Sequence, residues 1–193
     1  MDRSFLVKFI QNTSPSSTPA AEQIAQHFRP IEIGKHEYVL RQGQICNEYI
    51  FVETGFMRAF TFDEDGKEVS TNFYGKNSAV FEVASYFRRV PTKENIQALT
   101  PCFGWVGNYE EFQVLFHTIP TFRIFGRTIL VNGFVALKER MLSMINNSAE
   151  ERYLQLLQSK PEILQNVPLK HIASYLGVTD TSLSRIRKEI TER

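Results

Sequence analysis

Residues 167–190 read VPLKHIASYLGVTDTSLSRIRKEI and contain two short helical patterns joined by a turn. In the first pattern, Ile172, Ala173 and Leu176 share one apolar face, which is the spacing of a helix packed on one side. Ala173 is small enough for a second helix to cross it closely. Gly177 ends this first helix, because glycine adopts the left-handed C-terminal conformation at low cost.

The second half of this stretch predicts a helix that packs against the first. Val178 fills the core at the turn, and Thr179 or Asp180 can cap the next helix. The buried face of that helix consists of Leu183, Ile186 and Ile190. Two helices joined by a glycine turn in this way form a helix-turn-helix, whose second helix can enter the major groove of DNA.

The outward face of the second helix combines hydroxyl and cationic side chains. An arginine can bond guanine O6 and N7 together, while serine, threonine and lysine bond phosphates. The candidate DNA-binding residues are Thr179, Asp180, Thr181, Ser182, Ser184, Arg185, Arg187 and Lys188. A helix hairpin with an ordinary solvated face is the alternative, but Ala-x-x-x-Gly-Val-Thr followed by Leu-Ser-Arg is far more restrictive than a run of charges.

Residues 109–147 have helical periodicity, and Pro120 separates a short helix from a long one at about 120–147. Apolar residues with 4-3-4-3 spacing run along the long helix: Leu130, Phe134, Leu137, Met141 and Met144. This is the heptad pattern by which two helices pack side by side, so it predicts a homodimer. The alternative is a helix packed on its own barrel. The region after Ser148 is small for an independent core and is expected to depend on the long helix for support.

From Ile31 to about Gly107 the sequence predicts many short strands, rich in aromatic and β-branched residues and separated by turn residues. The Asp65-Gly66 pair in FTFDEDGKEVSTNF predicts a hairpin. Strands at this spacing favour an antiparallel barrel or sandwich. Before them, Asn12–Ala20 is expected to be a Ser/Thr/Pro loop between two short helices.

The composition restricts the class of protein but does not indicate a binding partner. With 22 basic and 21 acidic residues the net charge is +1, so a DNA-binding surface has to be local. Cys46 and Cys102 are isolated and are expected to be buried thiols. Neither a leader peptide nor an apolar run long enough to cross a bilayer is found, which predicts a cytoplasmic protein that does not contact membranes.

Known catalytic and cofactor patterns are also missing from the sequence. The histidines are scattered at positions 27, 36, 117 and 171, without the clustering that a metal site needs. No Ser-His-Asp signature, phosphate loop, or haem or iron–sulfur spacing occurs. We therefore expect no enzyme activity, no metal and no resident cofactor.

The chain resembles the Crp/Fnr family of bacterial regulators, and most closely the short form common in Bacteroidetes. The strongest similarity is in IASYLGVTDTSLSRIRKEI (172–190), followed by AEERYLQLL (149–157). Gly34 and Gly43, followed by IFVETG (50–55), are similar to the family's β-roll. The resemblance implies an α+β protein with an N-terminal antiparallel β-roll of the cyclic-nucleotide-binding type, a long dimerisation helix and a C-terminal helix-turn-helix.

On this basis residues 1–147 are expected to form the effector domain with the dimer helix, and residues 148–193 the DNA-binding domain. The resemblance implies a transcription regulator, with duplex DNA, a second copy of the chain, RNA polymerase and a small-molecule effector as candidate partners. A regulatory barrel whose helix-turn-helix contacts proteins instead of DNA is the alternative function.

The segment that would hold a cyclic nucleotide departs from the family pattern. Relatives that bind cyclic AMP carry Gly-Glu and, further on, Arg-Ser or Arg-Thr. Here Phe81 precedes Glu82, and Thr92 and Lys93 occupy the Arg-Ser positions. A buried phosphate needs open backbone N–H groups and a fixed cation. Cyclic AMP is therefore not expected to bind with the affinity that its sensing relatives show, and the pocket is left to another small molecule or to none. The alternative is a cyclic nucleotide whose phosphate is met by Lys93 or Arg89 turning inward.

The C-terminal part departs from the pattern in two further ways. Asp180 and Thr181 stand where relatives often carry other base-reading residues, so the operator sequence is not predicted. The sequence ends at Arg193, soon after the second helix, which predicts a minimal C-terminal wing or none.

Overall fold

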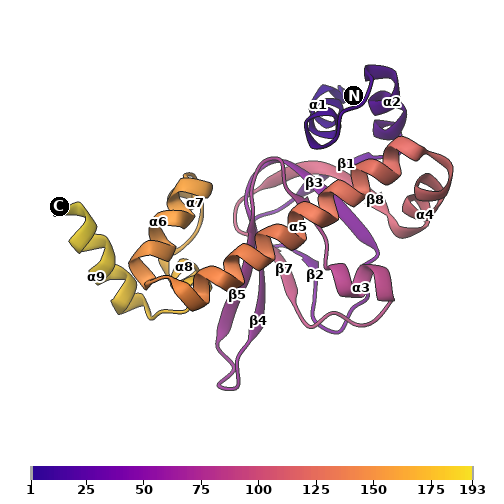
Figure 1. The fold of residues 1–193 in the computed structure, drawn as a ribbon. Helices are drawn as coiled ribbons and strands as arrows, with labels where there is room; N and C mark the ends of the chain where they lie inside the picture. The colour runs from indigo at the N-terminus through magenta and orange to yellow at the C-terminus, as the bar shows by residue number, and fades with distance from the viewer. Residues whose placement is uncertain (1, 193) are drawn as a thin grey trace.

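The computed structural model describes residues 2–192 and is α+β, with a two-sheet β-roll followed by a long helix and a small helical unit (Figure 1). The strands are β1 (Arg29–Ile33), β2 (Tyr38–Leu40), β3 (Glu48–Thr54), β4 (Met57–Phe62), β5 (Glu68–Tyr74), β6 (Ala79–Val80), β7 (Asn95–Ala98) and β8 (Cys102–Asn108). The helices are α1 (Ser4–Thr13), α2 (Thr18–Ala25), α3 (Val83–Arg88), α4 (Tyr109–Thr118), α5 (Pro120–Asn146), α6 (Ala149–Ser159), α7 (Ile163–Asn166), α8 (Leu169–Leu176) and α9 (Asp180–Thr191).

The roll consists of two antiparallel sheets, with strand orders β1-β8-β3-β6 and β2-β7-β4-β5. In the first sheet Phe51 of β3 pairs with Trp105 of β8. In the second, Phe60 of β4 pairs with Ser70 of β5, which lies at the free edge of its sheet. The predicted hairpin joins β4 to β5, and Gly66 at its tip has the positive φ of 77° that favours glycine.

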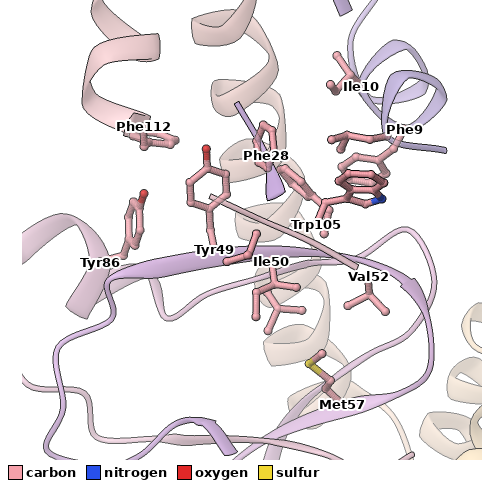
Figure 2. Packing of buried hydrophobic residues seen from close by; sticks show 14 of the residues in the cluster. Phe9, Ile10, Phe28, Tyr49, Ile50, Val52, Met57, Tyr86, Trp105 and Phe112 are labelled. Atoms are coloured by element: carbon pink, nitrogen blue, oxygen red, sulfur yellow. The ribbon is translucent and has the colours of Figure 1, made fainter. Parts of the chain in front are cut away.

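An aromatic layer fills the space between the first sheet and the helices that cover it (Figure 2). The ring of Phe51 lies 4.9 Å from Phe9 of α1 and 5.7 Å from Phe125 of α5. The ring of Tyr49 lies 5.5 Å from Phe112 of α4. Large buried rings dominate the energetics of such a core, so the roll, α1, α2, α4 and the first turns of α5 form one packed body.

One local expectation is wrong. The predicted Asn12–Ala20 loop contains the first turn of α2, which starts at Thr18. Ser17 caps this helix by accepting a hydrogen bond from the backbone N–H of Ala20, and Pro19 lies in the first turn. A serine cap followed by proline is a helix start signal, so the loop ends three residues earlier than expected.

The break between α4 and α5 falls at Pro120, as the sequence predicts, and α5 then runs past the roll to the helical unit (Figure 1). No single helix in residues 2–192 is both long and apolar enough to cross a membrane. Only α4 and α5 together meet that length and composition, and they are bent by 119° relative to each other.

The helical unit α6–α9 takes much of its support from the roll, whereas the sequence pointed to the long helix alone. Its core includes Tyr153, Ile172 and Leu183. Three side chains of the roll complete the same core: Phe56, Phe73 and Leu99. A unit this small buries too little apolar surface on its own, and the second sheet supplies the missing surface.

Candidate nucleic-acid interface and effector cavity

The turn between α8 and α9 is fixed by backbone hydrogen bonds around a left-handed glycine. Gly177 has φ 68°. The N–H of Gly177 donates to the carbonyl of Ser174 at 3.2 Å, and the N–H of Val178 to that of Ala173 at 3.0 Å. This satisfies carbonyls that the end of α8 would otherwise leave free. The Thr179 hydroxyl then caps α9 by accepting from the backbone N–H of Ser182 at 3.2 Å.

The two helices share one buried face, on the residues that the sequence predicts. Ile172, Ala173 and Leu176 of α8 are buried, as are Leu183 and Ile186 of α9. Ile190 packs at the margin of this core. Because these side chains point inward, the remaining positions of α9 face solvent.

The predicted DNA-binding residues are all on or beside this solvent face, and most are exposed. The exposed members are Thr179, Asp180, Thr181, Ser184, Arg185 and Lys188, while Ser182 and Arg187 are half-buried. The Arg185 side chain is 77% exposed and its guanidinium lies 3.8 Å from Glu189. Lys188 lies 3.7 Å from Glu192. Such exposed pairs are weak, so both cations can exchange them for phosphate or base contacts.

The outer part of α5 carries an apolar face that residues 2–192 leave largely exposed. Phe134 is 69% exposed and Leu137 is 62% exposed. Met141 and Met144 are exposed and Leu130 is half-buried. A second stripe lies beside the predicted one: Val131, Val135, Leu142 and Ile145. A large exposed apolar face of this kind is typical of surfaces that contact a protein or a membrane.

The roll has an open cavity of about 760 Å³. Its apolar lining residues include Leu40, Ile50 and Ile96. Its polar lining residues include Arg29, Gln44, Asn47, Glu48 and Asn108. Arg29 and Glu48 form an ion pair of 2.5 Å with each other. The cavity is large enough for a small organic molecule.

The four predicted effector-pocket residues are not brought together around this cavity. Only Phe81 lines it. Glu82 instead caps α3, because its carboxylate accepts from the backbone N–H groups of Ala84 at 3.0 Å and Ser85 at 2.7 Å. The side chain of Thr92 is buried and bonds to Glu94, while Lys93 is exposed.

Arg89, which follows α3, also has its guanidinium engaged by other groups of the chain. Arg89 donates to the carbonyl of Cys46 at 2.9 Å and to the side-chain oxygen of Asn47. Its guanidinium lies 4.0 Å from the ring centre of Tyr109. A phosphate needs a cation and N–H groups that are free to turn toward it, and here Glu82 and Arg89 hold the loop together instead.

Burial changes the acidity of both thiols and of one carboxyl group. It raises the pKa of the Cys46 thiol, which lines the cavity, and of the Cys102 thiol, and both cysteines are buried, as expected. Burial also raises the pKa of the Glu94 carboxyl. Within residues 2–192 no group of three His, Cys, Asp or Glu side chains could hold a metal ion.

Comparison with known proteins agrees with this architecture. Residues 30–118 match the family model described as the cyclic nucleotide-binding domain. The structure superposes on the c-di-GMP responsive regulator CLP of Xanthomonas campestris with a TM-score of 0.71, at 16% identity, covering 91% of this chain and 92% of that one. For FixK2 of Bradyrhizobium japonicum the TM-score is 0.71 at 14% identity, covering 86% and 85%. The chain has the Crp/Fnr fold.

A protein from Eubacterium rectale described as a regulator of the Crp/Fnr family gives a TM-score of 0.70 at 15% identity, covering 93% of this chain and 88% of that one. Among curated proteins, the acetyltransferase Pat of Mycolicibacterium smegmatis is 22% identical over 111 residues, or 58% of this chain. The chain spans about a third (32%) of the length of that relative.

Within this Crp/Fnr fold the structure reveals polar residues that the sequence did not single out. Arg58 of β4 is 3% exposed and donates to Nδ1 of His171 in α8 at 2.8 Å. Burial, with the nearby Arg58 charge, lowers the pKa of His171 to about 4, so the imidazole is neutral at pH 7. These two residues are 113 positions apart in the sequence, so no local pattern could have paired them.

Proposed function

We propose that the protein is a DNA-binding transcription regulator that acts as a homodimer and reads a palindromic operator with α9. The observation that carries this proposal is the helix-turn-helix whose buried face is complete while Arg185, Lys188 and the neighbouring hydroxyls remain exposed. An exposed second helix with such side chains has the shape and chemistry that the major groove accepts.

The dimer is inferred from the uncovered apolar face of α5. Two recognition helices must lie about 34 Å apart to read successive major grooves. A two-fold pairing of α5 buries Phe134 and Leu137 of both copies and supplies this symmetry. The second stripe on α5 widens the surface available for pairing. In this scheme residues 1–147 form the sensing and pairing unit and residues 148–193 the reading unit.

The proposed roles of the α9 residues follow from their positions. Arg185 lies in the second turn with an exposed guanidinium and is the main base reader. Lys188, Arg187 and Ser184 bond phosphates or neighbouring bases. The hydroxyls of Ser182 and Thr179 are hydrogen-bonded to each other at 2.9 Å. Both residues therefore act chiefly by capping the start of α9. Asp180 repels phosphates close to the helix start and therefore restricts the docking angle.

The roll is proposed as the sensor, with its 760 Å³ cavity as the effector site. Relatives with this fold include a regulator described as responsive to c-di-GMP. The cavity of this chain is lined largely by apolar residues, and the Glu82 carboxylate and the Arg89 guanidinium are both engaged in hydrogen bonds within the chain. This favours a neutral or apolar molecule over a cyclic nucleotide. RNA polymerase is a proposed partner at promoters, and the place of action is the cytoplasm.

The test is an electrophoretic shift assay with fragments of the source genome, followed by variants at the site found. Arg185→Ala should weaken binding to that site by about 1–3 kcal/mol and relax its sequence preference. Lys188→Ala should weaken all sequences alike and reduce the salt slope by about one. Lys8→Ala removes an equal charge from an exposed position of α1, at the other end of the molecule from α9 (Figure 1), and should change neither.

Two results would contradict the proposal. One is an unaltered protein that shifts no genomic fragment, which would favour a helix-turn-helix that contacts proteins. The other is an Arg185→Ala variant that binds the operator as tightly as the unaltered protein, which would show that the base reader is another residue.

A further inference from the structure

The free edge of β5 is covered by side chains from other parts of the chain. The backbone N–H of Ser70 donates to the hydroxyl of Ser174 at 3.1 Å, and the carbonyl of Thr71 accepts from Arg140 at 2.8 Å. The carbonyl of Phe73 accepts from the Nζ of Lys160. The three side chains come from α8, α5 and the end of α6. An uncovered edge strand exposes a row of unpaired backbone groups, and here the helical unit and the long helix occupy that row.

A buried arginine extends this contact onto the face of the sheet. Arg58 donates to the carboxylate of Glu68 at 2.6 Å, to the side-chain oxygen of Gln97 at 3.2 Å and to His171 at 2.8 Å. Its guanidinium also lies 3.9 Å from the ring centre of Phe60. Three of these partners belong to the roll, and His171 belongs to the helix-turn-helix. Since a buried guanidinium is costly without partners, loss of His171 from this set is unfavourable.

Arg140 joins all three parts of the protein at one point. Besides the carbonyl of Thr71 in β5, it donates to the carbonyl of Tyr175 in α8 at 3.0 Å. Its guanidinium stacks over the Tyr175 ring at 4.0 Å. That ring in turn lies 5.1 Å from the ring of Phe73 in β5. A residue of the proposed dimer helix therefore fixes both the roll and the reading unit.

We propose that the edge of β5 is a docking site that holds the helix-turn-helix in its DNA-reading orientation, with Arg140, Ser174 and the Arg58–His171 pair as positioning residues. The proposal rests on the proposed DNA-binding function and adds how the reading helix is aimed. The docked state leaves the solvent face of α9 open, as the exposure of Arg185 shows. A helical unit α6–α9 that is already held in place loses less orientational freedom when the two copies bind the two halves of the operator. Docking therefore strengthens operator binding.

The same contacts connect the cavity to the helical unit α6–α9. Ile96 lines the cavity and is followed on β7 by Gln97, which bonds to Arg58. Arg58 then bonds to His171 in α8.

The test compares Arg140→Met with Arg123→Met in the full-length protein. Both remove one guanidinium from α5, but Arg123 is exposed near the start of the helix, before the apolar stripes. Losing the Arg140 bonds should weaken operator binding about tenfold and speed hydrogen exchange at the Ser70 amide about tenfold, since these hydrogen bonds come from a charged group. The dimer dissociation constant should not change. Arg123→Met should leave both readouts unaltered.

A disulfide between β5 and α8 distinguishes a positioning role of Arg140 from a role in general stability. The hydroxyls of Ser70 and Ser174 are 3.2 Å apart, so Ser70→Cys with Ser174→Cys should oxidise readily, and the native thiols are buried. In the Arg140→Met background, the oxidised form should regain operator affinity and the reduced form should not. Affinity that fails to return, or an oxidised protein that cannot bind operator, would overturn the proposal.

Hydrogen exchange at the Ser70 amide is measured without DNA, so it tests the docking contact independently of the proposed DNA binding. Unchanged exchange at Ser70 in Arg140→Met would refute the docking role. An unaltered protein that binds no genomic fragment would refute the proposed function instead.

Discussion

Leu137→Glu should convert the protein to a monomer. Full burial of a leucine side chain stabilises by about 1.5–3 kcal/mol. Leu137 keeps 62% of its surface exposed in the protomer, so pairing two copies contributes about 2–4 kcal/mol from this residue. Its loss alone weakens the dimer about 30- to 700-fold, because 1.4 kcal/mol is a factor of ten. Two glutamates facing each other add a further penalty from desolvation and repulsion.

Sedimentation equilibrium over a concentration series measures this change directly. Asn132→Glu is the matched control, because it adds the same charge to an exposed position on another side of α5. The fold of each protomer should survive in both variants, as circular dichroism can show, since Leu137 packs little within the protomer. Pairing through Leu137 is refuted if Leu137→Glu and Asn132→Glu dimerise equally well, or if the unaltered protein is monomeric at micromolar concentration.

Three further predictions concern the effector cavity, the contact of His171 with the roll, and the turn at Gly177. Isothermal titration should detect no micromolar binding of cyclic AMP or cyclic GMP; micromolar binding abolished by Glu82→Ala would contradict the assignment of Glu82 as a helix cap. Because the pKa of His171 is about 4 in the folded protein, against an ordinary value of 6.5, the unfolded chain takes up the proton first as pH falls. Stability should therefore fall by up to about 3 kcal/mol as pH drops from 6.5 to 4, and His171→Gln should remove this component from the urea denaturation profile. Gly177→Ala should cost about 1–2 kcal/mol in the same assay, because alanine is strained at positive φ; Gly133→Ala, in mid-helix with open space around it, should stabilise by up to about 1 kcal/mol, and equal effects would rule out the left-handed requirement.

Much of the fold could be predicted because it follows from local patterns. The alternation of strands, the hairpin at Gly66 and the break at Pro120 each depend on residues a few positions apart. The spacing of Ile172, Ala173 and Leu176 before Gly177 likewise fixes the helix-turn-helix. The width of the apolar face on α5 could not be predicted in this way. The heptad pattern identified one stripe, whereas the exposure of Val131 and its neighbours became visible only once the side of α5 that packs on the roll was known.

The candidate effector residues show a different limit. By position, Glu82 matches the glutamate of the Gly-Glu pair expected from the family resemblance, yet its carboxylate caps the first turn of α3. A glutamate before a helix can act as a cap or turn into a cavity, and the sequence alone does not decide between them. The arrangement of backbone N–H groups around it decides.

The sequence by itself determined the elements: the roll's strands, the long helix, and a helix-turn-helix with Arg185 on the outer face of its second helix. Periodicity and capping depend on residues a few positions apart, so they can be recognised without knowledge of the fold. Only the tertiary structure decided where the helical unit α6–α9 lies. Arg58 meets His171, and Arg140 meets Thr71 and Tyr175, across separations of 35 to 113 residues. Such contacts depend on how completed elements dock, and no periodicity in the chain encodes them.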